Sequence, residues 1–173
     1  KMLQKAIQHA SATDHHVQVI TRVDVNVSSG ITRSVKELSI TCVIMGWSDK
    51  IKTGDKIFGT ILTNILNNCN QMLWVCRILQ PLNTLKKIIV LVPSNAEYEI
   101  GFMHLYAKLF ELSSQVGDGV TFCCSEETRK NLQKIAGKIK PGTNVQTQYF
   151  EDWDNWSGIP ELVQPNYLLI VIS

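Results

Sequence analysis

Short, continuous apolar runs separated by amphipathic segments restrict the fold of this chain more than any other feature. Runs of this kind occupy residues 40–45, 72–78, 87–92, 120–124 and 167–172. Runs of five to seven apolar residues are typical of buried strands, and the segments between them have the spacing of helices. Because strands that are apolar throughout belong to parallel sheets covered on both faces, the pattern predicts an α/β protein with a parallel, doubly wound sheet.

The remaining segments complete this alternation of strands and helices. Residues 16–25 (HVQVITRVDV) alternate apolar and polar side chains, which predicts a strand with one buried face. We expect a further strand over 145–150 and helices over 2–10, 31–38, 57–68, 98–112, 125–138 and 154–163. In the helix expected over 57–68, apolar residues at positions 57, 61, 62, 65 and 66 share one side.

Composition excludes several classes of protein. The chain has 173 residues, of which 45% are hydrophobic and 18% charged, and its net charge is +2. This balance argues against disorder and against a nucleic-acid-binding surface. No apolar run approaches the ~20 residues that span a bilayer, and no signal peptide is recognisable. The start at Lys1 and the end inside an apolar run predict a soluble fragment of a longer protein.

The cysteines and histidines indicate neither a disulfide framework nor a metal site. Five cysteines without a C-x-x-C motif predict free, mostly buried thiols in a reducing compartment. Asp14, His15 and His16 are adjacent, but no further ligand set has metal spacing. Because no nucleophile with an activating partner or paired acid constellation is recognisable, we expect no catalytic or metal-binding residues and no enzymatic activity.

The stretch from residue 40 to 78 contains the candidate binding site. An apolar run ends on Gly46, a polar loop follows, and Gly59 and Thr60 open a helical pattern. Glycines and a helix N-terminus of this kind can hold a phosphate group, because backbone N–H groups and the helix dipole face the loop. The alternative is a connection in which the glycines serve only the turn.

This loop resembles that of the universal stress proteins, which carry G-x2-G-x9-G-[S/T] and contact ATP through it. Gly46, Gly59 and Thr60 match three of the four marked positions, whereas Asp49 stands where the second glycine belongs, and Ser48 lies in the short spacer before it. The resemblance therefore implies a degenerate nucleotide site formed by these five residues. A carboxylate beside the phosphates lowers affinity, so ATP or AMP is expected to bind weakly.

The order of the elements resembles parts of two successive domains of that family. Residues 1–80 resemble the back portion of a first unit, residues 81–85 a linker, and residues 86–173 the front portion of a second unit. In the second unit the strand over 87–92 is followed by Pro93 and Ser94 rather than by the aspartate of the family. We therefore expect no nucleotide there.

Tandem degenerate units, together with the phrases VIMGW and KKIIVLVPSN, resemble the cytosolic tails of monovalent cation/proton antiporters. The resemblance implies a non-catalytic regulatory and assembly domain of a sodium or potassium/proton antiporter, at the cytoplasmic face of the membrane. Its partners would be the transport domain of the same polypeptide and a second copy. The alternative is a soluble universal stress protein that binds ATP.

Two segments that contain tryptophan lead to further structural predictions. The strand over 72–78, with Trp74, is expected at a domain or subunit interface, because apolar edge strands pair unless covered. Trp153 and Trp156 lie among acidic residues. They are expected to fix a short helix to the sheet, the alternative being an exposed contact with another domain.

Overall fold

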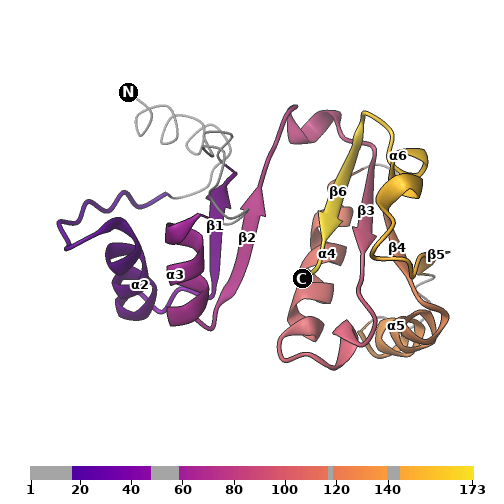
Figure 1. Ribbon diagram of the computed structural model, residues 1–173, viewed down its shortest axis with the longest axis horizontal. Coiled ribbons are helices and arrows are strands. Elements are labelled where there is room, and N and C mark those ends of the chain that lie inside the picture. Colours follow the sequence, from indigo (N-terminus) through magenta and orange to yellow (C-terminus); the bar gives the residue numbers. More distant parts are fainter. Residues whose placement is uncertain (1–16, 48–58, 117–118, 140–144) are drawn as a thin grey trace. The chain divides into compact units, whose positions relative to one another are not determined.

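The computed structural model describes residues 17–47, 59–116, 119–139 and 145–173 (Figure 1). It divides into two compact units, residues 1–76 and 77–173. Both contain parallel strands connected by helices. The predicted α/β class with parallel sheets is confirmed.

The described residues of unit 1 form two strands and two helices. Helix α2 (Val27–Glu37) precedes β1 (Cys42–Gly46), and α3 (Thr60–Asn68) connects β1 to the parallel strand β2 (Met72–Cys76). Asn26 caps α2, because its side-chain oxygen accepts a hydrogen bond from the Ser29 backbone N–H at 2.8 Å. The apolar core of this unit is small and contains Val35, Leu62 and Ile65.

Unit 2 is a four-stranded parallel sheet. Its strands are β3 (Lys87–Leu91), β4 (Val120–Cys124), β5 (Gln146–Tyr149) and β6 (Tyr167–Val171), and their order across the sheet is β5-β4-β3-β6. The connecting helices are α4 (Phe102–Ser113), α5 (Glu126–Ile139) and α6 (Ile159–Leu162), with short 3-10 turns η1 (Leu82–Thr84), η2 (Ala96–Tyr98) and η3 (Trp156–Gly158). This order is that of the first four strands of a common doubly wound fold.

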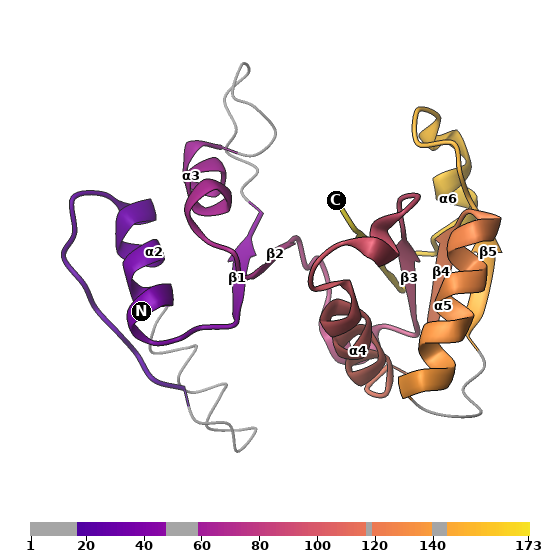
Figure 2. The ribbon, with the colours of Figure 1, turned by 90° about the horizontal axis from the view of Figure 1, so that it is seen from below.

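Helices cover both faces of the unit 2 sheet (Figure 2). On the face of α4 and α5, the Tyr106 ring stacks on Phe122 with centroids 5.2 Å apart, and its hydroxyl donates to the Leu132 carbonyl at 3.4 Å. On the opposite face, Ile159 of α6 packs with Ile89 and with other apolar residues, among them Leu91, Cys123 and Trp153. The predicted role of Trp153 is thereby confirmed, whereas Trp156 is 44% exposed.

One predicted strand is wrong. Residues 17–24 have no regular secondary structure, although their side chains alternate as in a strand. A strand needs a neighbour to satisfy its backbone N–H and C=O groups, and β1 pairs with β2 alone among the described residues. The segment instead lies along α2, to which it is joined by ion pairs. The helix predicted over 2–10 falls outside the described residues.

Other predictions needed smaller corrections. The run over 40–45 was expected to be buried, but Ile44 is 72% exposed, and β2 and most of β6 are half-buried. The helical face expected in 57–68 is buried at Leu62 and Ile65 alone among its described residues. Helix α4 begins at Phe102 rather than at residue 98, because Gly101 has a left-handed φ of 92° that interrupts the helix.

Candidate functional site

The residues on either side of the loop after β1 are described, and they form the strand end and the helix start that the sequence predicts. Gly46 is the last residue of β1, Gly59 is the N-cap of α3, and Thr60 is the first residue of that helix. Ser48 and Asp49 lie outside the described residues. A pocket formed by all five predicted residues therefore stays a prediction.

No side chain among the described residues caps the start of helix α3. Its N-cap residue, Gly59, has no side chain that could accept a hydrogen bond from the first turn, and the first turn contains no acidic residue. The first backbone N–H groups of a helix have no partner within the helix, so an uncapped first turn favours an anion. Gly59 has φ −40°, a value open to other residues, and a Cβ there would meet no described atom within 4 Å. Packing against the described residues thus does not require glycine at this position.

Unit 2 has a small pocket at the carboxyl ends of its strands, where ligands bind in open α/β sheets. Its volume is about 220 Å³. It is lined by residues that follow β3, β4 and β5, namely Ser94, Asn95, Ser125, Glu126, Glu127, Thr128 and Glu151. Three of these carry carboxylates that come from two different connections, and the sequence alone did not indicate that they would converge.

The same pocket is unfavourable for a phosphate group. Ser125 already caps α5, because its hydroxyl accepts from the Thr128 backbone N–H at 3.3 Å. The Arg129 guanidinium donates to the Glu126 carboxylate, and this hydrogen bond lowers the pKa of Glu126, which keeps its negative charge. A charged carboxylate near the helix N-terminus repels a phosphate group that approaches the same pocket.

Glu97 adds a further negative charge next to this pocket. Its carboxylate accepts a hydrogen bond from the Thr128 hydroxyl at 3.2 Å and another from the Asn131 amide at 2.8 Å. Thr128 is almost completely buried. These hydrogen bonds fix the acidic side chain of Glu97, which belongs to η2, against α5.

A second cavity lies between α2 and α3. Its volume is about 330 Å³ and all of its lining residues are polar: Asn26, Ser28, Ser29, Thr32, Arg33, Lys36, Asn64 and Asn68. Asn64 donates to the Ser28 hydroxyl at 3.4 Å, so the two helices meet partly through polar groups. None of the predicted site residues lines this cavity.

The cysteines are free, and two of them are poor nucleophiles. Cys123 and Cys124 are buried in β4, and burial raises the pKa of each thiol to about 11. Burial also raises the pKa of Cys76, with a smaller contribution from Cys42. A thiol needs a lowered pKa to react as a nucleophile near neutral pH. Among the described residues no cluster of three or more His, Cys, Asp or Glu side chains could hold a metal ion.

Comparison of the chain with protein-family models, with curated proteins and with solved structures gave no match. No helix within the described ranges combines the length and apolar character needed to cross a membrane.

Proposed function

We propose that this chain is a non-catalytic regulatory and assembly domain of a sodium or potassium/proton antiporter, located at the cytoplasmic face of the membrane. The main support is the strand arrangement. Unit 1 supplies two adjacent parallel strands joined by α3, and unit 2 supplies the first four strands of a doubly wound sheet. This agrees with the tandem arrangement that the resemblance to antiporter tails implies.

The proposed ligand is an adenine nucleotide that binds weakly at the loop after β1. The first turn of α3, which no described side chain caps, favours an anion there, whereas the acidic pocket of unit 2 disfavours one. Asp49, within the loop, would weaken the interaction with phosphate. A nucleotide would regulate transport only by binding one arrangement of the protein more tightly than another.

The proposed assembly surface is the open edge of β2. All five residues of Met72–Cys76 are half-buried, and β2 pairs with β1 alone among the described residues. An apolar parallel strand with an unpaired edge favours pairing with another copy. Light scattering of the purified chain should then give a dimer, and a monomer with Trp74 accessible to a quencher would contradict this.

The size and location of the native polypeptide test the proposal directly. Antibodies raised against this chain should detect a polypeptide much larger than its 19.5 kDa in the membrane fraction. Removing the coding region of this chain should alter cation-driven proton exchange in membrane vesicles. A polypeptide of about the same size in the soluble fraction would instead overturn the antiporter proposal.

The uncapped helix α3 also supports the second candidate, a soluble universal stress protein that binds ATP. Calorimetric titration distinguishes the two, because tight ATP binding by the unaltered chain is expected only of the second. Weak or undetectable binding, together with a large membrane-associated polypeptide, is expected of the first.

A further inference from the structure

Residues 17–25, termed the strap, have the side-chain pattern of a strand but lie outside any sheet. Val17, Val19, Val23 and Val25 alternate with mostly polar residues, and Val23 and Val25 are 100% and 92% exposed. In a strand these four valines would share one face. Their exposure shows that the apolar face of the strap is not used in the arrangement described.

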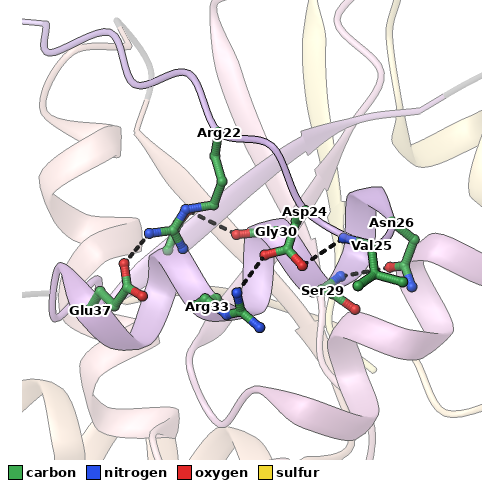
Figure 3. A network of polar contacts seen from close by, with 9 residues as sticks. Arg22, Asp24, Val25, Asn26, Ser29, Gly30, Arg33 and Glu37 are labelled. Atoms are coloured by element: carbon green, nitrogen blue, oxygen red, sulfur yellow. Dashed lines mark hydrogen bonds and ion pairs between the residues drawn. The ribbon is translucent and has the colours of Figure 1, made fainter.

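Two ion pairs hold the strap on α2 (Figure 3). Arg22 pairs with Glu37 near the end of α2, and Asp24 pairs with Arg33 at 3.3 Å. Both contacts use the polar side chains that alternate with the valines. The strap is therefore attached to α2 by its charges, whereas its apolar residues remain in solvent.

The Asp24–Arg33 contact is poorly satisfied. The Asp24 side chain is only 4% exposed, yet its Oδ2 accepts no hydrogen bond, and Arg33 is 60% exposed. Its Oδ1 accepts from the Val25 backbone N–H at 2.8 Å. A buried carboxylate oxygen without a hydrogen bond is unfavourable. This contact therefore stabilises the attached position only weakly.

The strap is connected to β1 through α2, so the open edge of β1 is the sheet edge closest to it along the chain. The Trp47 N–H donates to the Cys76 carbonyl, so the odd-numbered residues of β1 face β2. Along a strand the N–H groups alternate in direction, and those of Ile44 and Gly46 thus point to the other edge. No described strand pairs there, and the Ile44 side chain is 72% exposed.

We propose that the strap moves from α2 to this edge and pairs with β1 as a third parallel strand of unit 1. The connection through α2 is the strand–helix–strand crossover that joins neighbouring parallel strands. Docking covers the valine face of the strap and the exposed edge of β1. It requires the release of both ion pairs, so the strap is a conformational switch controlled by charge.

Amide hydrogen exchange of the full chain, read residue by residue by NMR, tests the switch. The double variant Arg33→Gln with Glu37→Gln removes both partners of the strap without altering the strap itself. We expect exchange at the Ile44 and Gly46 amides to slow by about tenfold or more, since these amides gain partners. The Val43 and Met45 amides, which face β2, should not change.

Two further variants control the experiment. Glu111→Gln breaks an exposed ion pair with Lys108 in unit 2 and should leave the Ile44 and Gly46 amides unchanged. Adding Val19→Asp and Val23→Asp to the double variant should restore fast exchange, because a charged face cannot cover the sheet. Helical circular dichroism checks that each variant is folded.

Unchanged exchange at Ile44 and Gly46 in a folded double variant would overturn the proposal. Protection that increases with protein concentration would also overturn it, because the added strand would then come from a second copy. Protection that is independent of concentration and is lost with the valine substitutions is the result expected of the switch.

Discussion

The two units use the same parallel strands and crossover helices, but their sheets differ in burial. In unit 2, four of the five residues of β3 and all five of β4 are buried. In unit 1, none of the residues that form β1 and β2 is buried. Strands β3 and β4 each have neighbours on both edges, whereas β1 and β2 have only each other among the described residues. An apolar run thus becomes core only when further strands and helices cover it.

The difference has an energetic consequence. Complete burial of a large aliphatic or aromatic side chain contributes about 1.5–3 kcal/mol relative to its exposure. Unit 2 gains this contribution at many positions, among them Ile88, Phe122 and Leu132, whereas unit 1 gains it at few. We therefore expect unit 2 to be the more stable part of the chain.

Truncation of the unit 2 core should have the largest effect. Phe122→Ala removes a completely buried ring that packs on Tyr106 and Phe110, and should cost about 3–5 kcal/mol in the unfolding free energy of unit 2. Ile44→Ala in β1 should cost less than about 1 kcal/mol, because Ile44 is largely exposed. Denaturant titrations followed by the indole signals of Trp153 and Trp74 report the two units separately. Equal losses would contradict the comparison.

Alkaline pH should destabilise unit 2 through its buried thiols. The folded pKa values of Cys123 and Cys124 are about 11, above the ordinary value of 9.0, so the unfolded state loses its protons first. The stabilisation is fully present below pH 9 and is lost as the pH rises to about 11, by an amount of the order of a few kcal/mol for the two thiols. Tyr106, whose pKa burial also raises, adds to the loss above pH 10.

Unfolding of unit 2 measured from pH 8 to 11 checks this expectation. Replacing both cysteines by alanine should flatten the pH dependence in the thiol range, while the Tyr106 contribution remains. A decline of the same size in the alanine variant would exclude the thiols as its cause.

The nucleotide site should respond to one substitution in the loop of unit 1. Asp49→Gly removes a carboxylate and restores the glycine of the universal stress protein pattern, so ATP affinity should rise by about 1–2 kcal/mol. Asp55→Gly removes the same charge further along the loop and should change affinity less. Calorimetry measures both. If neither the unaltered chain nor Asp49→Gly binds ATP, the loop from Gly46 to Thr60 is a structural connection only.

The smallest expected effect concerns the helix caps of the two units. Asn26→Ala removes the side-chain acceptor for Ser29 at the start of α2 and should lower the stability of unit 1 by about 1 kcal/mol. Asn155→Ala removes a similar acceptor for Ser157, but η3 is a single turn, so unit 2 should lose less than about 0.5 kcal/mol. Thermal unfolding of both variants compares the caps, and a larger loss from Asn155→Ala would contradict the expected order.

The sequence predicted some elements closely because local pattern and final packing agree there. The strand predicted over 120–124 has those bounds, and every side chain in it is buried. Residues 16–25 also have a clear local pattern, but pairing requires a neighbour that the pattern does not specify. The strap was consequently predicted as a strand, although in the structure it lies on α2.

The candidate sites show the same contrast between local features, which the sequence predicts, and long-range contacts, which it does not. Gly46, Gly59 and Thr60 were found from their spacing, because a strand end and a helix start are local features. The acidic pocket of unit 2 was not predicted, since Glu126 and Glu151 follow different strands and are 25 residues apart. Only the parallel alignment of β4 and β5 brings the residues after them to the same edge of the sheet.

The sequence by itself determined the alternation of strands and helices and the α/β class, because hydrophobic periodicity is a local property of the chain. The tertiary structure decided which apolar runs became core, which helices met through polar groups and which carboxylates converged. These outcomes depend on strand order and on contacts between residues far apart in the sequence. The apolar run of β4 is buried because it has β3 and β5 beside it and helices over both faces, whereas the run of β1 has one neighbouring strand among the described residues and leaves Ile44 in solvent.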